Sequence, residues 1–263
     1  MHLPPRPDDT EGVRLALDEG VATLTLSNPR RKNAITPPMW GELTEAFRWM
    51  AHDDTVRAVV VTGEGDDFCS GADLSDGPKV HATAYMRYLN EGPLALHALS
   101  KPTIARVDGI AAGAGLNLAL GCDLIVASDR ARFSEIFARR ALSIDYGGSW
   151  LLPRRVGLGK AKELALLADI VDAAEAQRIG LVNKVVPVGE LDSAVGAWAA
   201  QLAAGPPIAL AQTKAMLDAS SEMSLAQALE AEAAAQTVNF GTKDTAEAIQ
   251  AFLQKRTPTY RGR

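Results

Sequence analysis

Short apolar runs alternate with amphipathic stretches over the first two thirds of the chain, and this pattern predicts strands alternating with helices. The predicted strands span residues 21–26, 58–62, 104–107 and 124–127. One predicted helix begins at Thr36-Pro37-Pro38, and others span residues 85–99 and 116–121. Strands that alternate with helices indicate parallel β-α units, so the fold class is predicted to be α/β.

After about residue 187 the pattern contains only helices. The predicted helices span residues 191–204, 207–218, 225–239 and 245–255, and Ser224 with Gln227 forms a capping box before the third. By itself such a tail offers little surface on which its helices can bury their apolar faces. We therefore expect it to pack on a partner subunit. Three parts are therefore predicted: a flexible N-terminal arm (1–12), a core (13–190) and a helical oligomerisation region (191–263).

Composition limits the classes of partner. The 263 residues are 47% hydrophobic and 22% charged, which suits one large domain, alone or with an appendage. A net charge of -5 argues against a nucleic-acid-binding surface. Small basic clusters remain, at residues 30–32, 154–155 and 255–256. They suffice for one polyanionic small molecule, although solvated surface charge is the commoner role of such clusters.

The cysteines and the termini indicate a cytoplasmic protein. Cys69 and Cys122 are too few for a disulfide framework or a metal site, and each is expected to be a small buried hydrophobe. The polar, proline-rich residues 1–10 lack the apolar core of a signal peptide. The apolar region 104–127 contains Asp108, Asn117 and Asp123, so it is not expected to span a membrane.

Two small-residue turns each follow a predicted strand. One is Gly113-Ala114-Gly115, which leads into a helix, and the other is Cys69-Ser-Gly-Ala-Asp-Leu74. Such turns leave backbone N–H groups without a side chain in front of them. If both turns aim an N–H group at one oxygen, they form an oxyanion hole.

These turns carry a resemblance to a known family. Ser70-Gly-Ala-Asp-Leu74 and the run from Gly109 to Asp123 resemble the two signature turns of the crotonase superfamily, the enoyl-CoA hydratases and isomerases. Further matches lie at residues 28–34, 147–154, 176–182 and 252–256. The resemblance implies a crotonase-like core of repeated β-β-α units in a spiral, followed by a helical C-terminal trimerisation region. It also implies a homotrimer or a hexamer made of two trimers.

The resemblance assigns the oxyanion hole to the N–H groups of Ala72 and Ala114, which would bind the thioester oxygen of an acyl-CoA substrate. Hydratases of the family use two glutamates to position and split water. The matching positions here hold Asn117 and Phe137, and neither side chain transfers a proton. Asn117 is expected to hold a water molecule or a substrate group instead.

Two carboxylates lie near these positions. Glu135 stands two residues before Phe137. If this segment is helical, residues two apart point to different faces, so the sequence favours a place outside the site for Glu135. Positioning a water molecule in the site is the alternative role. Asp145 precedes the Gly147-Gly148 pair, as in isomerases of the family in which one aspartate moves the proton. One carboxylate suffices for isomerisation, whereas two groups suit hydration. Turn formation is the alternative role for Asp145.

The remaining assignments concern the substrate. Phe137, Trp150 and Tyr85 are expected to wall the acyl pocket, with ordinary packing as the alternative, and the tunnel-lining segment is expected within residues 78–99. The resemblance implies that CoA contacts Arg31, Lys32, Ala34, Asp73, Leu74 and, from a neighbouring subunit, Phe252 and Lys255. Coenzyme A is then part of the substrate, and no metal or tightly bound cofactor is expected.

Other functions compete with the isomerase. Gly113-Ala-Gly-Leu-Asn-Leu118 begins like a dinucleotide-binding motif, but Leu118 replaces its third glycine. Within the family, the alternatives are an enoyl-CoA hydratase, a non-catalytic acyl-CoA binder, and hydrolysis, decarboxylation or C–C cleavage of another acyl-CoA. An oxyanion hole serves each of these reactions, so fold alone does not choose between them.

Overall fold

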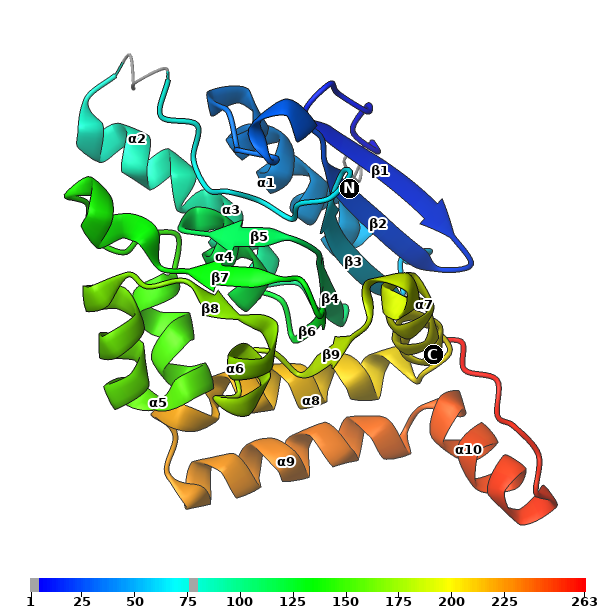
Figure 1. Cartoon of the computed structure of the whole chain (residues 1–263). Coiled ribbons are helices and arrows are strands. Elements are labelled where there is room, and N and C mark those ends of the chain that lie inside the picture. Colours follow the sequence, from blue (N-terminus) through cyan, green and yellow to red (C-terminus); the bar gives the residue numbers. More distant parts are fainter. Residues whose placement is uncertain (1–4, 76–79) are drawn as a thin grey trace.

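A six-stranded sheet forms the centre of the molecule in the computed structural model, which describes residues 5–75 and 80–263 (Figure 1). In spatial order its strands are β1 (Val13–Asp18), β2 (Val21–Leu26), β3 (Ala58–Gly63), β4 (Thr103–Val107), β6 (Leu124–Ser128) and β9 (Lys184–Val186). The β1–β2 pair is antiparallel and the later pairs are parallel. The four predicted strands and the parallel architecture are confirmed.

A second, three-stranded sheet carries the segments that lead into the site. Its strands are β5 (Ile110–Ala112), β7 (Arg132–Ser134) and β8 (Val171–Asp172). The β5 and β7 strands run parallel, with Ala112 opposite Ser134. The residues that follow them, Gly113 and Glu135, therefore leave the sheet at the same edge. Strands of two or three residues carry too little alternation for the sequence to predict them.

Helices cover both sheets. They are α1 (Pro37–His52), α2 (Ala82–Leu89), α3 (Glu91–His97), α4 (Ala114–Leu120), α5 (Gly148–Leu167), α6 (Ala173–Arg178), α7 (Leu191–Ala203), α8 (Pro207–Ala219), α9 (Leu225–Phe240) and α10 (Lys243–Gln254). Helix α1 begins as predicted, with Thr36 as its N-cap and proline in its first turn. Its apolar stripe, which includes Leu43 and Phe47, is fully buried in the main core.

The single helix predicted over residues 85–99 is wrong. Two shorter helices, α2 and α3, occupy this region and meet at Asn90. Pro93 explains the break, because it has no N–H to donate and its ring would clash with the carbonyl of Leu89, the last residue of α2.

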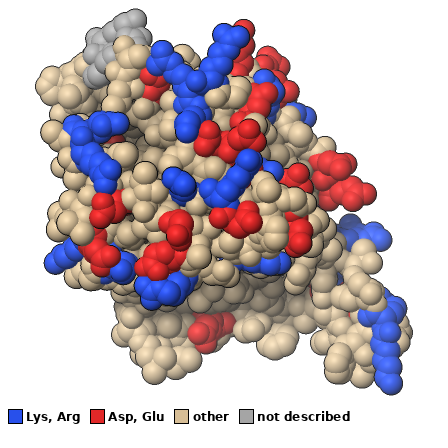
Figure 2. Space-filling view, in the orientation of Figure 1, with Lys and Arg blue, Asp and Glu red and all other residues tan. Residues whose placement is uncertain are grey.

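The helical C-terminal region divides into one packed helix and an extended arm. Helix α7 buries Leu191, Val195 and Ala199 against the six-stranded sheet, so the prediction that this region lacks a surface to pack on is wrong for α7. Within the described chain, α8 and α9 bury no side chain fully. Helices α9 and α10 form an arm below the body in Figure 1. Figure 2 shows mixed charges over the body and few charges along the base of this face.

The described part of the N-terminal arm is hydrogen-bonded to the body, and the C-terminal tail is hydrogen-bonded to Asp244 on α10. In the described part of the N-terminal arm, residues 5–12, Asp9 accepts a hydrogen bond from Leu15 N–H at 2.7 Å and Thr10 donates to Glu42 at 2.8 Å. Residues 1–4 of that arm, and residues 78 and 79 of the predicted tunnel segment, lie outside the described residues. The C-terminal tail runs back from α10 toward α7 (Figure 1).

No single described helix is long and apolar enough to cross a membrane. The segments Val188–Ala203 and Pro207–Glu222 meet that criterion only when they are counted together, and the chain bends by 107° between them.

Replacing Gly196 in α7 with alanine is expected to stabilise the fold by about 0.5–1 kcal/mol, because glycine loses more backbone entropy than alanine in a helix. A Cβ at this position would have no atom within 4 Å, so the change adds no clash. Urea unfolding of both proteins measures the difference. A less stable variant would contradict the open space found beside Gly196.

Candidate active site

The two small-residue turns lie against each other. A parallel bridge joins Ile35 to Ala72, in which Ile35 N–H donates to Gly71 and Ile35 C=O accepts from Asp73. Because Ile35 bonds to the residues on either side of Ala72, the N–H of Ala72 points away from that bridge. Ala114 is the first residue of α4, where an N–H has no intrahelical acceptor. The predicted oxyanion donors thus lie on adjoining turns with their N–H groups available.

Glycine is required for this close approach. Gly71 has φ = +101°, and a Cβ on it would lie 2.9 Å from the carbonyl oxygen of Ala112 and 3.6 Å from the nitrogen of Ala114. A Cβ on Gly115 would overlap the carbonyl oxygen of Cys69. Larger residues at these two positions would push the turns apart.

Asn117, Glu135 and Asp145 form a polar cluster beside the turns. The Asn117 amide donates to the backbone oxygen of Asp145 at 2.9 Å, and a Cβ on Gly148 would overlap that amide. Asn117 is 1% exposed and Glu135 is 1% exposed. Four buried oxygens of the cluster have no hydrogen-bond partner, namely Asn117 Oδ1, Glu135 Oε1, Glu135 Oε2 and Asp145 Oδ1.

Glu135 is the residue that sequence reasoning misplaced. The helical periodicity used to direct it to another face does not apply, because β7 ends at Ser134 and Glu135 is the N-cap of the 3-10 helix Ile136–Arg140. The parallel β5–β7 pair sets Glu135 beside Gly113, which donates its N–H to Ser134 at 2.9 Å.

The two carboxyl groups differ in acidity. Burial raises the pKa of Glu135 to about 8; the Asn117 side chain opposes this rise and Asp145 adds to it. Burial also raises the pKa of Asp145 to about 6. Near neutral pH, Asp145 is therefore mostly ionised while Glu135 holds its proton. A pair of titratable groups with separated pKa values is typical of acid-base sites.

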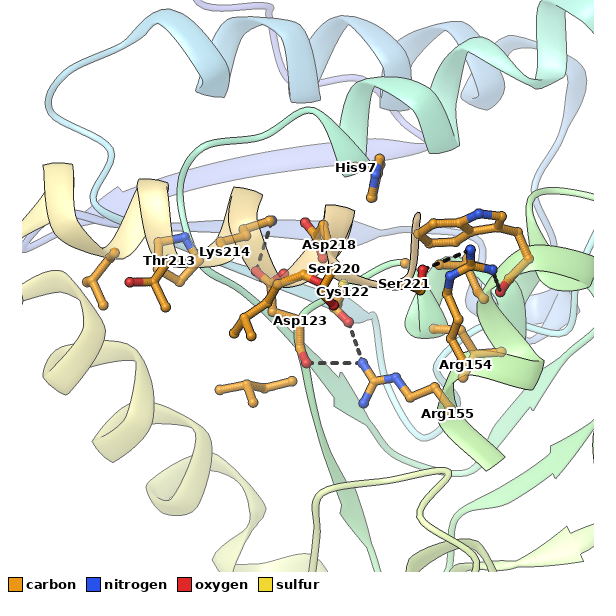
Figure 3. A pocket seen from close by; sticks show the side chains of 18 of the residues that line it. His97, Cys122, Asp123, Arg154, Arg155, Thr213, Lys214, Asp218, Ser220 and Ser221 are labelled. Atoms are coloured by element: carbon orange, nitrogen blue, oxygen red, sulfur yellow. Dashed lines mark hydrogen bonds and ion pairs between the residues drawn. The ribbon is translucent and has the colours of Figure 1, made fainter. Parts of the chain in front are cut away.

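The three predicted pocket aromatics lie in different places. Phe137 is buried, and its ring would lie 3.6 Å from a Cβ on Gly113, next to the oxyanion turn. Tyr85 on α2 is half-buried against the main core. Trp150 instead lines a cavity of about 590 Å³ between the core and α8, which none of the cluster residues lines (Figure 3). There Arg154 stacks over its ring, 3.6 Å from the centroid.

The residues predicted on the CoA side gather from two loops. Arg31 donates to the Asp73 carboxylate at 2.9 Å and to Ser75 at 3.0 Å. The Lys32 ammonium lies 4.0 Å from a carboxylate oxygen of Asp67. Leu74, which follows Asp73, is 65% exposed. The Ile35–Ala72 bridge connects these loops to the oxyanion turn. Ala34, which precedes Ile35, is buried.

The other two predicted CoA contacts lie at the far end of the helical arm. Phe252 is 83% exposed on α10, and Lys255 follows that helix in a left-handed conformation. Figure 1 shows α10 away from the body that carries the two loops. Within one chain, the structure therefore does not bring these residues to the predicted CoA side.

The two cysteines lie in the interior of the chain. Cys69 and Cys122 are buried as predicted, and burial raises the pKa of each thiol to about 12. Thiols of such high pKa are poor nucleophiles at neutral pH. No group of three His, Cys, Asp or Glu side chains in the described ranges is arranged to hold a metal ion.

Comparison with known proteins agrees with this geometry. The family model "Enoyl-CoA hydratase/isomerase" matches residues 16–263. The chain is 39% identical to a "Probable enoyl-CoA hydratase" of Rhodobacter capsulatus (95% of this chain, 98% of the relative). It is 35% identical to the 1,2-epoxyphenylacetyl-CoA isomerase of Escherichia coli (94% and 97%). A solved enoyl-CoA hydratase from Polaromonas sp. JS666 superposes with a TM-score of 0.89 at 36% identity, over 95% of this chain and 99% of that one. The predicted crotonase-like α/β fold is confirmed, and the chain belongs to the enoyl-CoA hydratase/isomerase family.

Proposed function

We propose that this protein is an enoyl-CoA isomerase in which Asp145 moves a proton between two carbons of the acyl chain. The observation that carries the proposal is the partly buried Asp145 carboxylate beside Asn117, whose Oδ1 has no hydrogen-bond partner, at a site where neither hydratase glutamate is present. The isomerase name of the Escherichia coli relative adds support, since that protein is 35% identical to this chain.

The proposed reaction uses one carboxylate twice. The Asp145 carboxylate takes a proton from C2 of a 3-enoyl thioester, and the electron pair spreads from C2 over the thioester carbonyl and the C3–C4 double bond. The N–H groups of Ala72 and Ala114 stabilise the negative oxygen. Asp145 then returns the proton to C4, the double bond moves to C2–C3, and the carboxylate is regenerated. The sequence of steps needs no metal or bound cofactor.

Hydration is the second candidate, and a specific observation favours it. Glu135 lies in the cluster with Asp145, so the site holds two carboxyl groups of different pKa. Adding water across a 2-enoyl thioester requires a base for the water and an acid for C2, which two such groups supply. Relatives named as hydratases support this candidate.

Product analysis in deuterated water separates the two candidates. The protein is incubated with a short straight-chain 3-enoyl-CoA and, separately, with the matching 2-enoyl-CoA, and the products are resolved by mass spectrometry. Double-bond migration without 3-hydroxyacyl product is the expected result. Hydration of the 2-enoyl substrate at an enzymatic rate would replace the isomerase with the hydratase. Binding of acyl-CoA without turnover would indicate a non-catalytic member.

We also propose that the helical arm assembles the protein into a trimer or hexamer and supplies Phe252 and Lys255 to a neighbouring CoA site. Large apolar side chains stand exposed along the arm, namely Leu225, Leu229, Val238, Phe240, Phe252 and Leu253. Exposed apolar surface of this kind marks contact surfaces. Light scattering after gel filtration gives the mass, expected as three or six times 27.9 kDa. A monomer would refute the assembly.

A further inference from the structure

The hydrogen bonds of the acidic cluster do not balance if both carboxyl groups are ionised. Asn117 Oδ1, both Glu135 oxygens and Asp145 Oδ1 are buried and unpartnered, and all four are then acceptors. The Asn117 amide nitrogen carries two N–H groups, and one of them donates to the backbone oxygen of Asp145. The other faces Glu135 and is a single donor for four acceptor oxygens. A buried polar group without a partner costs about 1–3 kcal/mol, so a proton on one of the carboxyl oxygens stabilises the cluster.

Nothing charged neutralises Glu135 in the described chain. The side chains that act on it are Asn117 from α4 and Asp145 from the loop before α5. Arg140, on the 3-10 helix that follows Glu135, is exposed, and three other cationic side chains on nearby elements are bonded elsewhere. Arg139 pairs with Asp169 at 2.7 Å, Arg178 pairs with Glu175 at 2.5 Å, and Arg155 donates to backbone oxygens of residues 122 and 123. An ionised Glu135 would thus be a buried anion next to another anion.

The order of ionisation follows from burial. Glu135 is 1% exposed, whereas Asp145 is only partly buried, so Glu135 pays the larger desolvation cost for a charge. The pKa values of about 8 for Glu135 and about 6 for Asp145 agree with this order. The pair titrates as a unit, and the first proton lost leaves a single negative charge in the cluster.

We propose that Glu135 is a positioning residue that stays a neutral carboxylic acid and donates its O–H within the Asn117–Asp145 cluster, which leaves Asp145 as the single anion. This inference rests on the proposed function, in which Asp145 is the base. A neutral Glu135 supplies the missing donor. Its ionisation would set a second negative charge beside Asp145 and beside the developing thioester oxyanion, and would switch the site off.

The pH dependence of kcat tests the proposal. With a 3-enoyl-CoA substrate, kcat is expected to rise through about pH 6 as Asp145 ionises and to fall through about pH 8 as Glu135 ionises. Glu135→Gln keeps a neutral donor of similar size, so kcat at pH 7 stays within a few-fold and the alkaline fall disappears. Glu135→Leu removes the donor, and kcat falls at every pH while KM changes little. Glu175→Gln, at a half-buried glutamate paired with Arg178 on α6, is the matched control and keeps the wild-type profile.

A second readout does not depend on activity. Infrared spectra of the wild-type protein are expected to contain a protonated carboxyl band at pH 7 that Glu135→Gln lacks and that disappears through about pH 8. If the wild-type and Glu135→Gln spectra at pH 7 do not differ in this band, Glu135 is ionised at pH 7 and the proposal is overturned. An alkaline fall in kcat that persists in Glu135→Gln also overturns it. If no isomerisation occurs, the proposed function fails separately, and the infrared titration alone decides the state of Glu135.

Discussion

Asp145→Asn is expected to lower kcat for double-bond migration by about 10³-fold, within the 10²–10⁴ range typical of a lost acid-base group. Asparagine has the same shape as aspartate but neither accepts nor returns a proton. The backbone hydrogen bond from Asn117 to residue 145 does not involve the replaced atoms, so the loop is expected to keep its position. KM is expected to change little, and steady-state kinetics with a 3-enoyl-CoA measures both constants.

Asp218→Asn is the matched control for this experiment. Asp218 is also a partly buried carboxylate whose pKa burial raises, but it lines the separate cavity against α8 (Figure 3). Its replacement is expected to leave kcat unchanged. If Asp145→Asn kept more than a tenth of wild-type kcat, another group would be moving the proton, and Glu135 would be the first to examine.

Gly115→Ala is expected to lower kcat by about 10²–10³-fold, the cost of losing one donor from an oxyanion hole. The added Cβ would overlap the carbonyl oxygen of Cys69, and its next contacts, the Cys69 carbonyl carbon and Cβ, lie at 2.8 Å. The Cys69 backbone can make room for this Cβ only if the two turns move apart. That movement would take the N–H of Ala114 away from the N–H of Ala72. The same crowding is expected to cost about 1–3 kcal/mol of stability, as overpacked cores do.

Gly196→Ala serves as the control, since it makes the same chemical change where a Cβ meets open space. Kinetics and urea unfolding are measured for both variants under conditions in which each is fully folded. A Gly115→Ala variant with wild-type kcat would show that the two turns do not act together on the thioester oxygen. A variant that cannot be folded is replaced by Gly71→Ala, whose Cβ would approach Ala112 at 2.9 Å.

Local patterns predicted most of the regular elements because the information they need is local. Residues 21–26 alternate between buried and partly buried positions, and residues 58–62 are a continuous buried apolar run. Both patterns are clear local signals of a strand. The capping box at Ser224 and Gln227 is present in α9 as predicted. The prediction of one helix over residues 85–99 was wrong because the effect of Pro93 was not taken into account, and the two helices found there also begin and end earlier, at Ala82 and His97.

The candidate site was less predictable, since its members come from separate segments. Asn117, Glu135 and Asp145 lie on α4, at the end of β7 and before α5. Their meeting depends on the pairing of β5 with β7, two strands of three residues each. Trp150 was expected in the acyl pocket, but its ring lines the cavity between the core and α8, which the cluster residues do not line.

The sequence by itself determined the alternation of strands and helices, the two glycine turns, the buried cysteines and the resemblance to the family. Each depends on residues close together in the chain or on motifs in a fixed order. Only the tertiary structure decided that Glu135 joins Asp145, because short strands set their register through long-range hydrogen bonds that leave no periodic signal. The acidity of both carboxyl groups was decided in the same way, since burial in the folded chain raises each pKa.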